Sequence, residues 1–257
     1  MPSNPDTDPD PLAPLVLLPG VAEAVSRARE AVGRVHRHPA NRLGWPATAA
    51  EANVRAARAS AALDGGDSAV PSSGVVSDPV LAGALRVGEE LGRLLPVWRR
   101  TPLQALARLH MLAAADVVPS SSADAELGRP RTAPGVAARL DLLSTLLVSS
   151  LASARVPAPV LVAVVHGELL ALAPFTSGNG VVARAAARLT GIASGLDPRG
   201  LVVPEVGHLR RQSEYRSAAA GFAEGTESGL AQWLVHSCTA WETGAREAES
   251  IARAATP

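Results

Sequence analysis

Hydrophobic residues recur along most of the chain at the spacing of a helix. Val21, Val25, Ala28 and Val32 lie three or four positions apart, and charged residues fill the positions between them. The same periodicity predicts further helices at 48–62, 79–93, 102–112, 134–149, 159–172, 180–194, 205–223 and 227–254. No strand alternates with these segments, so the pattern predicts an all-α bundle.

Local signals predict where several helices begin and end. Thr48 with Glu51 three residues later has the pattern of a capping box, and Asp78 before Pro79 has the pattern of a cap followed by proline at the first helical position. Pro96 predicts the end of the helix that Pro79 opens, because an internal proline removes a backbone hydrogen bond.

The chain divides into a short tail and one domain. Residues 1–14 are acidic and rich in proline, so we expect a flexible tail there and a single helical domain over 15–257. Residues 117–131 form the longest polar stretch inside the domain, which is where we expect a short β-hairpin or a mobile loop.

Composition narrows the possible partners and location. The 24 basic residues, all arginine, balance 24 acidic ones, so neither a nucleic-acid footprint nor a polybasic membrane anchor is expected. We find no apolar stretch of 18 to 20 residues and therefore expect no membrane span. The lone Cys238 cannot form an internal disulfide, which favours the reduced cytoplasm. The lack of lysine beside abundant alanine and arginine is typical of a GC-rich, bacterial genome.

One window carries candidate chemistry. An apolar helix at 159–172 is followed by the turn Gly178-Asn179-Gly180 and then by another helix. Glycine and asparagine accept left-handed backbone angles, and such a turn can aim successive N–H groups from a helix N-terminus at a phosphate. The structural alternative is a tight turn in which glycine serves only the backbone.

The window resembles the motif of the Fic (Fido) family, His-x-Phe-x-Asp/Glu-Gly-Asn-Gly-Arg-x-x-Arg. Members usually carry proline after the first histidine and another histidine seven residues before it. Six motif positions match here, and a histidine stands at the upstream position: Pro174, Phe175, Gly178, Asn179, Gly180 and Arg184, with His166 upstream. The resemblance implies a Fic-like helical bundle with its core at about 45–220 and the C-terminal helix 227–254 packed on it.

Three departures from the motif bear on activity. The family transfers AMP, usually from ATP, to a protein hydroxyl, using the motif histidine as general base, the acidic residue for Mg²⁺ and the first arginine for phosphate charge. Ala173, Ser177 and Val181 stand at these positions. General-base help alone is worth about 10²- to 10⁴-fold in rate. We therefore expect no catalytic residue and no metal site, but an anion or nucleotide site at the turn and Arg184.

A second resemblance concerns regulation. Many Fic proteins carry an inhibitory helix, Ser/Thr-x-x-x-Glu-Gly/Asn, whose glutamate pairs with the second motif arginine and blocks the γ-phosphate position. Ser60, Asp64 and Gly65 match this pattern, with aspartate replacing glutamate. The resemblance predicts a buried ion pair between Asp64 and Arg184. The alternative is that Asp64 merely ends a helix before a glycine stop.

Three functions remain open at this point. The first is a pseudoenzyme that binds ATP, another nucleotide or an unknown protein partner without ordinary AMP transfer. The second is a divergent Fic enzyme that transfers a nucleotide or phosphoryl group to a protein hydroxyl. The third is an NAD(P)-binding oxidoreductase, since Gly178-x-Gly180-x-x-Ala183 with Asp197 also fits a dinucleotide fingerprint, provided that a strand precedes the glycines. His166 is expected to be a core histidine, and the oligomeric state stays open.

Overall fold

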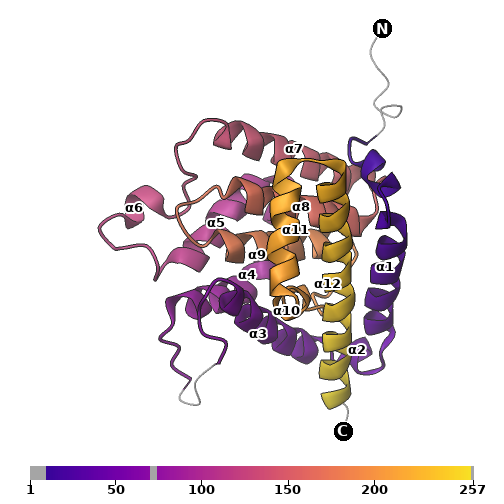
Figure 1. The fold of residues 1–257 in the computed structure, drawn as a ribbon. Coiled ribbons are helices and arrows are strands. Elements are labelled where there is room, and N and C mark those ends of the chain that lie inside the picture. Colours follow the sequence, from indigo (N-terminus) through magenta and orange to yellow (C-terminus); the bar gives the residue numbers. More distant parts are fainter. Residues whose placement is uncertain (1–9, 70–73, 256–257) are drawn as a thin grey trace.

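The structure, a computed structural model, describes residues 10–69 and 74–255, and every regular element among them is helical (Figure 1). A short 3₁₀ helix comes first and twelve α-helices follow in the described part: η1 (Ala13–Leu17), α1 (Val21–Arg37), α2 (Ala40–Leu43), α3 (Trp45–Leu63), α4 (Pro79–Arg100), α5 (Pro102–Ala114), α6 (Ala123–Glu126), α7 (Val136–Ser153), α8 (Ala158–Leu172), α9 (Asn179–Ala193), α10 (Pro204–Arg210), α11 (Gln212–Glu224) and α12 (Glu227–Ala254). The all-α prediction is confirmed.

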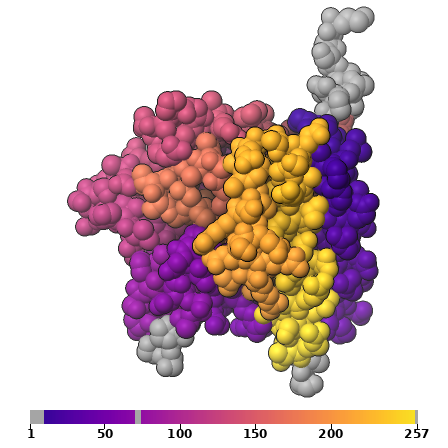
Figure 2. All heavy atoms as spheres, in the orientation of Figure 1, coloured from indigo at the N-terminus to yellow at the C-terminus, as the bar shows by residue number. Residues whose placement is uncertain are grey.

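Helix α8 lies at the centre of the bundle. Eleven of its fifteen residues are buried, as its nearly all-round apolar sequence predicts. It packs against α9, and α7, α11 and α12 enclose it. Helices α10, α11 and α12, orange to yellow, form one continuous patch at the centre and right of the face shown in Figure 2. Helices α3, α4 and α5 also pack against α9, and α3 contacts α10 as well.

The first described residues are ordered rather than tail-like. The Asp10 side chain accepts a hydrogen bond from the Leu12 backbone N–H at 3.0 Å, and Leu12 is buried in the core. The folded domain therefore begins a few residues before the expected boundary at 15. Residues 1–9 of the expected tail lie outside the described part.

Several helix boundaries differ from the sequence prediction, among them α7, which spans Val136–Ser153 rather than 134–149, and two of the differences have a clear local cause. Helix α3 begins at Trp45 because Pro46 presets the helical backbone there, and Thr48 instead donates to Asn41 Oδ1 at 2.8 Å from inside the helix. Helix α4 continues through Pro96 to Arg100. The carbonyl that Pro96 leaves unpaired belongs to Gly92, which is exposed, so water can satisfy it. By contrast, the predicted Asp78 cap is present.

The segment 205–223, expected as a single helix, is divided. Arg211 has φ −126° and ψ 45°, and this non-helical residue separates α10 from α11. The break lets α10 turn to pack against α3 and α12, while α11 packs on α8 and α12.

The β-hairpin considered for 117–131 is wrong. This stretch contains turns and the short helix α6, and no strand occurs in it. Ala123, Ala125 and Glu126 are good helix formers. Pro119 and Pro130 lack the N–H that strand pairing needs. The end of this stretch is tied to the turn after α8, since the Arg131 backbone N–H donates to the Pro174 carbonyl at 2.8 Å.

Helix α7 differs from the expectation that no apolar stretch reaches 18 residues. Its 18 residues are long and apolar enough to cross a membrane by length and composition, and it is the one such helix in the described part of the chain. That test gives weak evidence, since core helices of soluble proteins also pass it. Arg139 and Asp141 lie within α7, and its buried side chains, such as Leu140 and Leu147, belong to the main core.

Candidate functional site

The turn between α8 and α9 is held in shape by its own residues. Ala173 ends α8 with φ 41°, and Gly178 precedes α9 with φ 65°, so both adopt the left-handed region. Asn179 accepts from the Phe175 backbone N–H at 2.9 Å and donates to the Phe175 carbonyl at 2.8 Å. The Asn179 side chain thus braces the turn instead of facing a ligand. The buried Phe175 ring stacks on His110 with centroids 4.0 Å apart.

A carboxylate of the protein itself occupies the N-terminus of α9. Asp64, the C-cap residue of α3, accepts a hydrogen bond from the Val181 backbone N–H at 3.1 Å. Gly180 makes this approach possible, because a Cβ at that position would overlap both carboxylate oxygens. A negative group is favoured at a helix N-terminus, so Asp64 sits where the sequence predicts an anion site.

The predicted ion pair between Asp64 and Arg184 is present, with Arg184 Nη2 2.9 Å from Asp64 Oδ1. Arg184 also donates through Nε to Ser60 Oγ at 2.8 Å and through Nη2 to the Ser60 carbonyl at 2.9 Å. Its side chain is only 2% exposed, whereas that of Asp64 is 26% exposed. Burial works against the charge of Arg184, but the contacts with Tyr215 and Asp64 outweigh it and raise its pKa.

A polar chain leads from this pair into the core. Arg184 Nη1 lies 3.5 Å from the Tyr215 hydroxyl, which in turn lies 2.9 Å from His166 Nε2. Burial, aided by the charge of Arg184, lowers the pKa of His166 well below its usual value, so the ring is neutral. His166 also packs edge-on against Trp233. This matches the expectation of a core histidine, now with a defined hydrogen-bond partner.

The three substituted motif positions offer no replacement chemistry. Ala173 presents a methyl group, and its carbonyl accepts from Arg131 Nε at 2.8 Å. The Ser177 hydroxyl is buried and has no hydrogen-bond partner within the described residues. Val181 is buried in the core. The described residues contain no group of three or more His, Cys, Asp or Glu side chains that could hold a metal ion.

Several residues in and around the candidate site were not predicted from the sequence. Tyr215 and Arg131 match no motif position. Arg131 Nη2 nevertheless donates to the Leu172 carbonyl at 2.8 Å and so closes the end of α8. Buried Arg188 lies 3.9 Å from buried Glu205, and burial raises the pKa of that carboxyl. A cavity of about 20 Å³ beside them has room for one water molecule.

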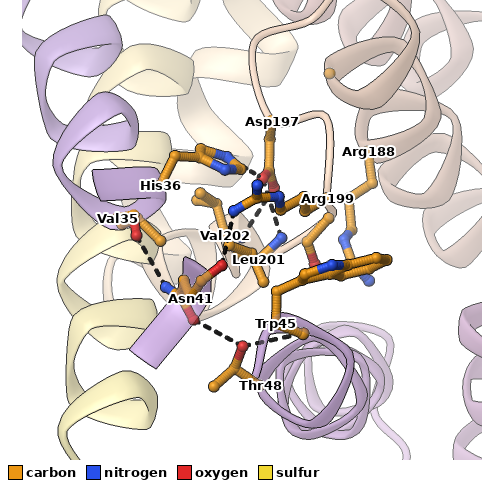
Figure 3. Close-up of polar contacts among 12 residues, drawn as sticks. Val35, His36, Asn41, Trp45, Thr48, Arg188, Asp197, Arg199, Leu201 and Val202 are labelled. Atoms are coloured by element: carbon orange, nitrogen blue, oxygen red, sulfur yellow. Dashed lines mark hydrogen bonds and ion pairs between the residues drawn. The ribbon is translucent and has the colours of Figure 1, made fainter. Parts of the chain in front are cut away.

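The dinucleotide alternative lacks its structural context. Helix α8 and an irregular turn, not a strand, precede Gly178 within the described chain. Asp197 is also engaged elsewhere: it accepts from the backbone N–H groups of Leu201 at 3.0 Å and Val202 at 2.8 Å and contacts His36 Nε2 at 2.8 Å (Figure 3). These contacts hold the loop after α9 in place, so the structure gives no support to an NAD(P) site.

Comparison with known proteins identifies the fold. No family model matches the chain, and no curated protein does. Among solved structures, a Fic family protein from Desulfovibrio desulfuricans G20 is 21% identical, with a TM-score of 0.68 over 90% of this chain and 74% of that one. Fic-1 from C. elegans is 17% identical, with a TM-score of 0.66 over 92% of this chain and 73% of its own. The chain therefore has the Fic fold, as its motif predicts.

Proposed function

We propose that this Fic-fold protein is a pseudoenzyme that binds a nucleotide at the N-terminus of α9 and does not transfer AMP. The contact of Asp64 with Val181 N–H and Arg184 carries the proposal, because it supports an anion site that an internal carboxylate keeps closed. The Fic fold of the chain supports the proposal.

The proposed loss of transfer rests on what surrounds the site. A methyl group at Ala173 cannot accept a proton, and Ser177 offers a neutral hydroxyl where the motif has an acidic residue for Mg²⁺. Losing a general base costs about 10²- to 10⁴-fold in rate, and phosphoryl-type transfer depends further on metal and arginine charge. The remaining groups bind an anion but do not activate a hydroxyl.

Nucleotide binding requires Asp64 to leave. A phosphate oxygen would take over the bonds from Val181 N–H and Arg184, so the exchange conserves hydrogen bonds. Asp64 can leave with little rearrangement, because it is the last residue before a loop and its side chain is 26% exposed. Gly65, which follows it, has φ 84°. The nucleotide and the Asp64 carboxylate therefore compete for one site.

Titration calorimetry of the full chain with ATP, with and without Mg²⁺, tests this competition. We expect weak binding by the unmodified protein and at least tenfold tighter binding by Asp64→Ala. Asp67→Ala is the matched control, because Asp67 is an exposed carboxylate three residues further along with no hydrogen bond or ion pair among the described residues. Equal affinity of the Asp64 and Asp67 variants would contradict the proposal. Absence of ATP binding in both would favour a protein partner instead.

A divergent transferase is the second candidate, favoured by the intact turn from Gly178 to Gly180. Incubation with labelled nucleotides and a cell lysate separates the two. We expect no labelled protein. Labelling that disappears in Asn179→Ala, which loses both bonds to Phe175, would overturn the pseudoenzyme while leaving nucleotide binding in place.

A further inference from the structure

A second cavity lies at the opposite end of the central helix pair. Its volume is about 710 Å³, and its walls come from the second half of α1, the connection between α7 and α8, and the segment that follows α9. Helix α9 has 15 residues and is therefore about 22 Å long, so this cavity is far from the Gly178 turn at the other end of the same helix. We call it the α1–α9 cavity.

The walls of the α1–α9 cavity carry one sign of charge. Arg29 and Arg37 line it together with His36, and none of its lining residues within the described chain is Asp or Glu. Arg29, Gly33 and Arg37 are four residues apart and so share one face of α1. The Arg37 guanidinium folds back over Gly33, since a Cβ there would lie 3.0 Å from its Nη1. Like charges gathered on one wall favour an anionic occupant.

The other arginines of α1 show what pairing looks like on the same helix. Arg27 pairs with Glu242 at 3.6 Å, and Arg34 pairs with Glu30 at 3.3 Å and Glu249 at 3.5 Å. Arg29 and Arg37 have no carboxylate partner among the described residues. Helix α1 thus directs its neutralised arginines toward α12 and its unneutralised pair toward the cavity.

Asp197 lies between two lining residues, Leu196 and Pro198, but its carboxylate is bound to other groups. Asp197, which is 2% exposed, accepts two backbone N–H groups and contacts His36 Nε2 at 2.8 Å (Figure 3). This bond fixes the orientation of the His36 ring at the wall. Asp197 is not part of the lining and forms no ion pair with Arg29 or Arg37.

Apolar side chains complete the walls. Leu151, Val156, Leu161 and Leu196 line the cavity beside the charged groups. Arginine binds phosphate through paired N–H donors and also packs flat against planar groups, so such a mixed wall suits a phosphate attached to an apolar body. We infer that the α1–α9 cavity binds a small phosphate-bearing molecule of nucleotide size. This site is separate from the proposed nucleotide site at α9 and does not depend on it.

Calorimetry on the full chain tests the inference with inorganic triphosphate, ATP and adenosine as probes. We expect triphosphate and ATP to bind the unmodified protein and adenosine not to bind, because the guanidinium groups recognise phosphate. The variant Arg29→Ser/Arg37→Ser should lose at least about tenfold in affinity, the scale of one or two charge-assisted hydrogen bonds. The variant Arg27→Ser/Arg34→Ser removes the same net charge from the same helix and should stay within twofold.

The outcomes separate the two sites. Affinity for triphosphate that is unchanged in Arg29→Ser/Arg37→Ser, or lowered equally in the control variant, would overturn the inference, as would no binding at 10 mM triphosphate. Binding that Asp64→Ala adds, and that survives Arg29→Ser/Arg37→Ser, belongs to the proposed nucleotide site. Unfolding curves of both double variants, matched to the unmodified protein, show that the fold is intact.

Discussion

Gly180 offers the sharpest test of the closed anion site, through the substitution Gly180→Ala. The three atoms nearest to the added methyl group all belong to the Asp64 carboxyl group, and the overlap forces that group away. The variant should therefore lose the bond from Val181 N–H and weaken the pair with Arg184. In most helices the same change stabilises, because alanine is the better helix former.

Two opposing effects set the change in the free energy of unfolding that Gly180→Ala should cause. A hydrogen bond to a charged group contributes about 1.5–3 kcal/mol, and leaving the buried Arg184 less well paired adds to the loss. Alanine returns about 1 kcal/mol of helix propensity. We expect the free energy of unfolding to fall by about 2 kcal/mol, which lowers Tm by about 4–8 °C for a domain of this size. In an Asp64→Ala background the overlap is gone, so Gly180→Ala should stabilise by about 0.5–1 kcal/mol.

Urea unfolding followed by circular dichroism at 222 nm measures all four members of this double-mutant cycle. The geometry requires Gly180→Ala to destabilise the unmodified protein and to stabilise Asp64→Ala. The coupling free energy should be about 2–3 kcal/mol. Additive effects, with Gly180→Ala destabilising equally in both backgrounds, would refute the contact between Asp64 and the helix N-terminus. Equal slopes of the four curves confirm that the unfolded states are comparable.

Three further predictions concern the core around the site. Arg184→Met leaves its polar partners unpaired and should lower the free energy of unfolding by about 3–5 kcal/mol in urea denaturation. Ala173→Gly removes the cost of the left-handed backbone at φ 41° and should raise Tm in a thermal melt, corresponding to about 0.5–1 kcal/mol. The folded pKa values of His166, His208 and His236 are lowered by burial, that of His236 to about 4. The unfolded chain therefore gains protons first as pH falls below about 6.5, and stability should drop by about 4 kcal/mol between pH 7 and pH 5.5 in urea titrations.

Matched measurements control these predictions. Arg216→Met, at an exposed arginine with no hydrogen bond or ion pair in the described part of the chain, should change stability by less than about 0.5 kcal/mol. Ala171→Gly, two residues before Ala173 in helical backbone, should destabilise by about 1 kcal/mol. If the left-handed backbone of Ala173 carried no strain, Ala173→Gly would destabilise the protein as Ala171→Gly does. A flat pH profile down to 5.5 would show that the three histidines are accessible to protons.

The helical periodicity was sufficient to predict the architecture. The nearly all-apolar segment at 159–172 became the buried α8, and 227–254 became α12 with the predicted bounds. Boundaries that depend on solvent or on neighbours were less predictable. Pro96 stays helical because the carbonyl that it leaves unpaired belongs to an exposed residue, and nothing local to Pro96 reports that exposure.

The sequence predicted the part of the candidate site whose contacts follow from the spacing of the motif residues. The resemblance predicted the pair between Asp64 and Arg184, which are 120 residues apart, because the motif encodes a known arrangement of helices. Tyr215 and Arg131 were missed for the opposite reason. Both make their contacts through tertiary packing, and an isolated tyrosine or arginine in a helical sequence carries no pattern that distinguishes it.

The tethered carboxylate of Asp64 also shifts the ligand concentration at which the site fills. If the closed arrangement is favoured by about 2 kcal/mol, about 3% of molecules are open at any moment, and the apparent affinity for a nucleotide is weakened about 30-fold. A ligand with micromolar intrinsic affinity would then half-saturate the protein only at tens of micromolar. The missing methylene that distinguishes aspartate from glutamate at position 64 thereby becomes a setting for the ligand concentration at which the protein responds.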